Sequence, residues 1–116
     1  MAVVPRFAEL LAALFDHGVE FIVVGGVAAV LEGAPISTFD LDIVPRWSPE
    51  NLDRLAGALE ALDALYRGRD IRPTRERLES PGHHLLETRL GALDVLGTVS
   101  PSRRFEDLER SLAGKR

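Results

Sequence analysis

Two acidic residues occupy alternate positions of a segment that otherwise has the pattern of a half-buried β-strand. Polar and apolar residues alternate between Ser37 and Val44: Thr38, Asp40 and Asp42 against Phe39, Leu41 and Ile43. Successive side chains of a strand point to opposite faces of the sheet, so a period of two places Asp40 and Asp42 side by side on one face. Two carboxylates that close repel each other unless a cation lies between them or one is protonated. The segment therefore predicts a sheet with one apolar face and a cation on the other.

Length and composition are those of an ordinary globular chain. The 116 residues suffice for one hydrophobic core, which predicts a single domain over residues 1–116. No stretch approaches the roughly 20 apolar residues that cross a bilayer. With no recognisable signal peptide, we expect a cytosolic, cytoplasmic protein that has no membrane partner. Cysteine is absent, which excludes disulfides, thiolate zinc sites and cysteine nucleophiles.

Charge is distributed unevenly along the chain. The net charge of −4 argues against a protein whose whole surface binds nucleic acid. Five arginines nevertheless fall within residues 67–77: Arg67, Arg69, Arg72, Arg75 and Arg77. Arginine suits bidentate phosphate contacts, so this cluster could hold a triphosphate or an RNA acceptor. A solvated loop whose arginines pair with Glu76 and Glu79 is the favoured alternative.

Periodicity predicts the order helix, strand, helix, strand, helix, hairpin, helix. We expect a helix over 7–15, a buried strand over 21–24, a short helix over 27–32 and a strand over 37–44 that ends at Pro45. Ser48, Pro49 and Glu50 have the pattern of a helix start. The apolar face of that helix comprises Leu52, Leu55, Leu59 and Leu62. A loop or irregular strand over 67–82, a hairpin of 84–89 and 92–96, and a helix from residue 100 complete the chain. The fold class is α/β or α+β, with helices packed on a small mixed sheet.

Asp94 lies in a second apolar strand, between Leu93 and Val95. A carboxylate there is costly unless it is paired or bound to a metal. Mg²⁺, or in second place Mn²⁺, prefers such oxygen ligands. A third acid beside Asp40 and Asp42 would complete a two-metal site that stabilises the attacking and leaving oxygens of a phosphoryl displacement. The alternative is a structural acid in a salt bridge, with Arg89 as a candidate partner.

A pair of glycines follows the first predicted strand. A Gly25-Gly26 turn lets backbone N–H groups approach a phosphate closely. The N-terminus of a following helix would add free donors and a favourable dipole. The pair is common after strands, so it indicates a phosphate site only in combination with the acids.

These features together resemble a known family signature. Val24-Gly25-Gly26, thirteen residues and then Asp40-Leu41-Asp42-Ile43 resemble the signature of the nucleotidyltransferase superfamily, which has the DNA polymerase β-like fold. Residues 33–43, 44–45, 48–52, 88–97 and 105–108 are similar to the small prokaryotic branch that includes AbiEii-type toxins and their stand-alone relatives. The resemblance covers roughly residues 7 to 112.

The resemblance implies the activity and the site. A nucleoside monophosphate would pass from a nucleoside triphosphate such as ATP to a hydroxyl of an RNA end, a protein or a small molecule, with release of pyrophosphate. Nucleotide-binding residues would be Gly25, Gly26, Ser37 and Thr38. Catalytic residues and Mg²⁺ ligands would be Asp40, Asp42 and Asp94, with Asp94 as base or second-metal ligand.

Two departures from the family pattern favour an alternative function. Relatives commonly carry an arginine at the position of Ile36, and many continue beyond the position of Arg116. Both departures fit a weakly active or inactive binding module, such as an antitoxin-like partner in a toxin–antitoxin pair. Such a module would form a homodimer or bind a heteromeric partner subunit.

Three aromatic or imidazole side chains have alternative interpretations. Adjacent histidines on a strand point to opposite faces, so for His83 and His84 we expect solvent exposure or a structural hydrogen bond rather than a metal. Trp47 is equally suited to stacking on a nucleobase and to covering the sheet edge.

Overall fold

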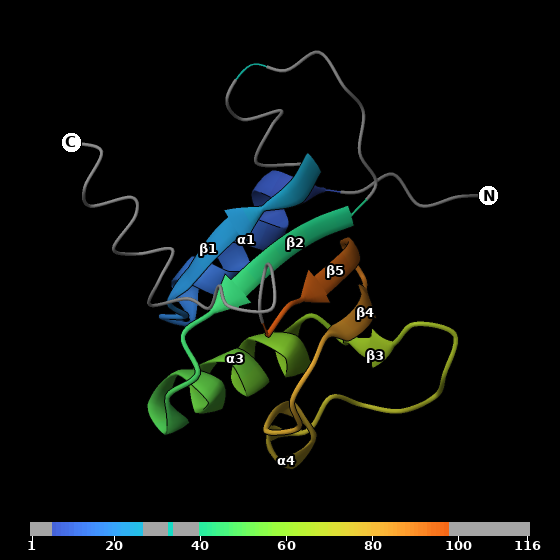
Figure 1. Ribbon diagram of the computed structural model, residues 1–116. Helices are drawn as coiled ribbons and strands as arrows, with labels where there is room; N and C mark the ends of the chain where they lie inside the picture. Colours follow the sequence, from blue (N-terminus) through green and yellow to red (C-terminus); the bar gives the residue numbers. More distant parts are fainter. Residues whose placement is uncertain (1–5, 27–32, 34–39, 98–116) are drawn as a thin grey trace.

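The computed structural model describes residues 6–26, 33 and 40–97 (Figure 1). Its elements, in chain order, are α1 (Phe7–Asp16), β1 (Phe21–Val24), β2 (Asp40–Pro45), α3 (Pro49–Ala61), β3 (Leu65–Tyr66), α4 (Arg75–Leu78), β4 (His84–Thr88) and β5 (Gly91–Val95). The helix expected over 27–32, the first residues of the strand expected over 37–44 and the helix expected from residue 100 lie outside the described residues. No helix in the described ranges is long and apolar enough to cross a membrane.

The five strands form one mixed sheet in the order β1-β2-β5-β4-β3. The β2 and β5 strands are parallel, and the other neighbouring pairs are antiparallel. The predicted hairpin is confirmed as β4 and β5. Thr88 closes its turn, because its hydroxyl donates to the Gly91 carbonyl at 2.8 Å and accepts from the Leu90 N–H at 3.0 Å. The described part is thus an α+β unit with a mixed sheet, as the sequence predicts.

Helices α1 and α3 pack against one face of the sheet. Leu10 and Leu14 of α1 are fully buried, as the spacing of its apolar residues predicts. The predicted face of α3 is also buried: Leu52, Leu55, Leu59 and Leu62. These side chains meet Leu41, Ile43, Leu86, Leu93 and Val95 of the sheet in one core. Asp40 and Asp42 therefore lie on the face of the sheet that α1 and α3 do not cover.

The beginning of α3 is fixed by two polar side chains. The Ser48 hydroxyl accepts the Asn51 N–H at 3.2 Å, which confirms the predicted capping position. Asn51 is buried, and its side chain accepts from the Glu20 N–H at 2.7 Å and donates to the carbonyls of Glu20 and Arg46 at 2.9 and 2.8 Å. The Asn51 amide therefore joins α3 to the residues that flank β1 and β2.

The structure corrects three of the predicted elements. The β1 strand was expected to be buried, but it lies at the edge of the sheet and all four of its residues are half-buried. The β2 strand includes Pro45, because an antiparallel partner is present opposite it at Phe21. The segment 67–82 contains α4, one turn of helix whose Thr74 hydroxyl accepts the Arg77 N–H at 3.3 Å. A turn this short leaves no periodicity in the sequence.

Candidate functional site

Strands β2 and β5 bring two of the predicted acids together. In their parallel register Asp42 lies directly opposite Asp94, and Asp40 lies opposite Ala92. Leu41 and Leu93 face the core under the helices, so the three acids lie on the other face. The prediction that Asp40, Asp42 and Asp94 share one face of neighbouring strands is therefore confirmed.

Burial and the neighbouring Asp94 raise the pKa of Asp42 to about 6. Burial has the largest effect, and hydrogen bonding with Asp94 and the negative charge of Asp94 act in the same direction. The charge of Asp40 adds to the effect, and the Arg67 guanidinium opposes it. Carboxylates in this arrangement favour the arrival of positive charge, as a proton or as a metal ion.

Arg67 supplies positive charge to the pair. Its Nη2 donates to Oδ1 of Asp94 at 2.6 Å and to the Leu86 carbonyl at 2.9 Å. Its backbone N–H binds the Leu85 carbonyl at 2.9 Å, which holds the residue at the edge of β4. The Asp94 side chain is only 14% exposed, so this charge-assisted bond is partly shielded from water.

The prediction that Arg89 pairs with Asp94 is wrong. Arg89 lies in the β4–β5 turn, where its N–H binds the Leu62 carbonyl at 3.1 Å and its side chain reaches the Ala61 carbonyl at 3.5 Å. The sequence places Arg89 near Asp94 along the chain, but the sheet places Arg67 beside Asp94. Membership of the arginine cluster was the only sequence signal for Arg67.

Gly25 meets the acidic pair directly. It follows β1, whose last residue Val24 lies opposite Asp42. Gly25 has φ +74°, and a β-carbon there would overlap Oδ2 of Asp42. Glycine is therefore required on both conformational and steric grounds. Gly26 follows directly, whereas the other predicted nucleotide-binding residues, Ser37 and Thr38, lie outside the described residues, as does Ile36.

A metal ion requires oxygen ligands that converge on one point. Among the described residues, no group of three or more His, Asp or Glu side chains has the arrangement of a metal site. Mg²⁺, however, is usually held by one or two carboxylates together with waters and substrate phosphates. Asp42 and Asp94, two carboxylates directly opposite each other on neighbouring strands, match that smaller donor set. Their chemistry suits a hard divalent cation that arrives with a phosphate ligand.

The two histidines behave as the sequence predicts. His83 is exposed and His84 is buried, on opposite faces of the chain. Nε2 of His84 lies 3.0 Å from the Ser80 carbonyl, which only accepts, so Nε2 carries the proton. Nδ1 of His84 then accepts from the Tyr66 hydroxyl at 2.7 Å. The Trp47 ring packs against the core with its centroid 6.2 Å from that of His84, which favours the covering role.

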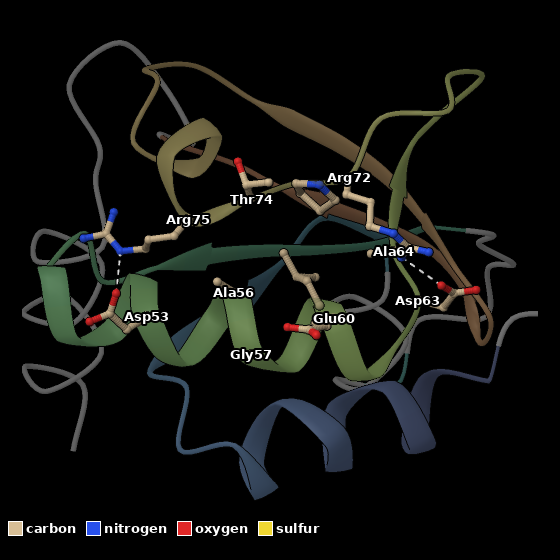
Figure 2. A pocket seen from close by; sticks show the side chains of 11 residues that line it. Asp53, Ala56, Gly57, Glu60, Asp63, Ala64, Arg72, Thr74 and Arg75 are labelled. Carbon is tan, nitrogen blue, oxygen red and sulfur yellow. Dashed lines mark hydrogen bonds and ion pairs between the residues drawn. The ribbon is translucent and has the colours of Figure 1, made fainter.

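Two of the five arginines of the cluster are neutralised around a hollow of about 730 Å³ between α3 and residues 72–75 (Figure 2). Arg72 lies 2.8 Å from Asp63, and Arg75 lies 2.7 Å from Asp53 and 2.5 Å from Glu79. The predicted pairing with Glu79 is confirmed for Arg75, and Asp53 of α3 and Asp63 just after it are partners that the sequence did not indicate. With Glu60 also in its lining, this hollow has no excess of positive charge.

Comparisons of the chain with protein-family models, with curated proteins and with solved structures find no match. The acids, Arg67 and Gly25 are therefore the features of this chain that indicate a function.

Proposed function

We propose that this protein is a Mg²⁺-dependent nucleotidyltransferase of the polymerase β-like fold. The observation that supports it best is the contact between Gly25, which follows β1, and Asp42, which lies directly opposite Asp94 in the sheet. A side-chain-free backbone turn for phosphates and a carboxylate pair for a divalent cation are the two parts that phosphoryl transfer needs. They come from separate segments of the chain and meet at one place.

Each residue has a proposed role. Asp42 and Asp94 would hold Mg²⁺, with Asp40 adding negative charge from two residues earlier on β2. The ion, when bound, supplies charge stabilisation for the phosphate oxygens and the leaving group. The backbone of Gly25 and Gly26 would lie against the triphosphate, since no side chain intervenes at Gly25. Ser37 and Thr38 complete the proposed nucleotide-binding set.

The proposed reaction conserves atoms and charge. The oxygen of the acceptor hydroxyl forms a bond to the α-phosphorus of the triphosphate. The bond from that phosphorus to the oxygen that bridges to the β-phosphate breaks, and pyrophosphate leaves with the electron pair. The hydroxyl proton passes to Asp94 or to solvent.

Calorimetric titration of ATP, GTP, CTP and UTP tests the proposal. We expect one triphosphate to bind in the presence of Mg²⁺ and to lose most of its affinity in EDTA or in the Asp42→Asn variant. Asp16→Asn removes an equal charge at the exposed end of α1 and serves as the matched control, with unchanged affinity expected. Metal-independent binding, or full binding by Asp42→Asn, would refute the assignment.

The Arg67–Asp94 ion pair favours a second candidate function. It occupies one oxygen of the proposed ligand set with a side chain of the same protein. A nucleotidyltransferase-like module with little activity, which binds a partner subunit or a second copy, would keep such a pair permanently. Light scattering combined with a transfer assay separates the candidates: an active monomer contradicts the binding module, and an inactive oligomer contradicts the enzyme.

A further inference from the structure

A second hollow, of about 610 Å³, opens beside the acidic pair at the β3–β4 edge of the sheet. Three arginines of the cluster line it, namely Arg67, Arg69 and Arg77, together with the exposed His83. No aspartate or glutamate lines it in the part of the chain that the structure describes. Arg67 is paired with Asp94 and lies 3.9 Å from Glu87, so the positive charge of this hollow comes from Arg69 and Arg77.

Three of the five arginines in the cluster have ion pairs. Arg67 pairs with Asp94, Arg72 with Asp63, and Arg75 with Asp53 and Glu79. Arg69 and Arg77 have no ion pair with any described residue, and Nη1 of Arg77 lies only at 3.4 Å from the Arg72 carbonyl. Two guanidinium groups are thus left with donors directed at no acid of the described chain.

Hydrogen bonds fix the framework that carries these groups. The Tyr66 N–H binds the Ile71 carbonyl and the Arg69 N–H binds the Tyr66 carbonyl, both at 2.9 Å, which closes the loop between β3 and residue 71. On the other wall, His84 links the Tyr66 hydroxyl to the Ser80 carbonyl. A loop closed in this way presents its arginines at a smaller entropic cost than a free loop.

We propose that this hollow binds the phosphate groups of a ligand. Guanidinium groups form bidentate, charge-assisted hydrogen bonds with phosphate oxygens, and an exposed histidine adds a donor. The shared chemistry is the phosphate, which a nucleic-acid strand or a small phosphorylated compound could supply. Arg67 lies in the wall of the hollow and its guanidinium is 2.6 Å from Asp94, so this residue connects the hollow to the acidic pair. This inference does not depend on nucleotidyl transfer.

The test measures binding of a fluorescently labelled single-stranded oligoribonucleotide and of inorganic pyrophosphate, in EDTA and without nucleoside triphosphate. The Arg69→Ala/Arg77→Ala variant should bind about tenfold more weakly or worse. For the oligonucleotide, the slope of log K against log salt should fall by about 1.4, because two phosphate contacts are lost. Arg54→Ala/Arg89→Ala removes the same charge from exposed positions outside the hollow and should bind like the parent.

The two probes identify the source of the phosphate. The site is supported if the parent and the control variant bind one of the probes and the Arg69→Ala/Arg77→Ala variant does not. The probe that binds identifies the source of the phosphate. Equal weakening in both double variants, or no binding of either probe at about 0.15 M salt, overturns it. Asp42→Asn should retain this binding, so failure of the nucleotidyltransferase proposal and failure of the phosphate site are separate results.

Discussion

A carboxylate oxygen of Asp42 occupies the space in which a side chain at Gly25 would begin. Gly25 directly follows β1, whose last residue, Val24, lies opposite Asp42 in the antiparallel strand β2. The glycine therefore does more than allow a turn, because its missing side chain lets an acid lie against the backbone of residue 25. This contact is the basis of the first prediction.

Gly25→Ala should abolish Mg²⁺-dependent triphosphate binding and destabilise the fold. The new methyl group must displace the Asp42 carboxylate, and the alanine backbone must adopt φ +74°. Gly18→Ala is the matched control, since Gly18 has φ +73° but only an ordinary contact of 3.6 Å with Arg54. The control should lose about 1–2 kcal/mol of unfolding free energy from the left-handed backbone alone and keep the binding. Equal losses in urea unfolding for both variants would show that the Asp42 contact is unimportant.

Asp42 should make the metal-free protein less stable as the pH rises. Burial first, and then Asp94, raise the pKa of Asp42 from 3.8 to about 6, so the folded state binds the proton more tightly than the unfolded state. Unfolding free energy therefore falls between these two pKa values and stays low above them. Asp42→Asn should remove this slope and gain about 1–2 kcal/mol at neutral pH, a value reduced for partial exposure.

Urea unfolding of the parent and of Asp42→Asn, in EDTA, at several pH values between about 4 and 8 measures the difference. Asp16→Asn should run parallel to the parent, since its carboxylate lies at the exposed end of α1. A parent that gains stability relative to Asp42→Asn as the pH rises contradicts the prediction.

Arg67 and a divalent cation should compete for Asp94. The guanidinium holds Oδ1 of Asp94 at 2.6 Å, so Mg²⁺ must displace or rearrange it to use that oxygen. Arg67→Met keeps most of the aliphatic stem and removes the charge. It should bind Mg²⁺ more tightly than the parent in the absence of nucleotide, by calorimetry. Arg54→Met is the control for lost positive charge. Weaker or unchanged Mg²⁺ affinity in Arg67→Met would show that the two cations do not share the carboxylate.

Asn51→Ala should be among the more destabilising substitutions in the described part of the chain. It removes three hydrogen bonds from a buried amide and leaves the Glu20 N–H without its partner. We expect a loss of about 2–4 kcal/mol, because each unsatisfied buried group costs about 1–3 kcal/mol. Glu60→Ala, at an exposed position of the same helix, should change stability by less than about 0.5 kcal/mol. A small effect of Asn51→Ala in chemical unfolding would contradict this role.

The sequence by itself determined the local elements and the faces of the strands. Alternation along 40–43 placed both acids on one face, because the side-chain period of a strand is two whatever the neighbouring strands are. Ser48 and Pro49 marked the start of α3, because capping depends on the backbone groups of a single turn. The spacing of Leu10 and Leu14, and of the leucines of α3, gave the buried faces for the same local reason.

Only the tertiary structure decided which groups meet. The parallel register of β2 and β5 sets Asp42 against Asp94, and it depends on a pairing between segments about fifty residues apart. Arg67 follows β3, and the strand order places β3 beside β4 and β4 beside β5, so its side chain reaches Asp94 across β4. Arg89 is nearer to Asp94 in the sequence but does not bind it. The same packing divided the arginine cluster, since α3 neutralises Arg75 but supplies no acid to Arg69. Periodicity reports the environment of one segment, whereas these contacts arise from strand order, which no local pattern encodes.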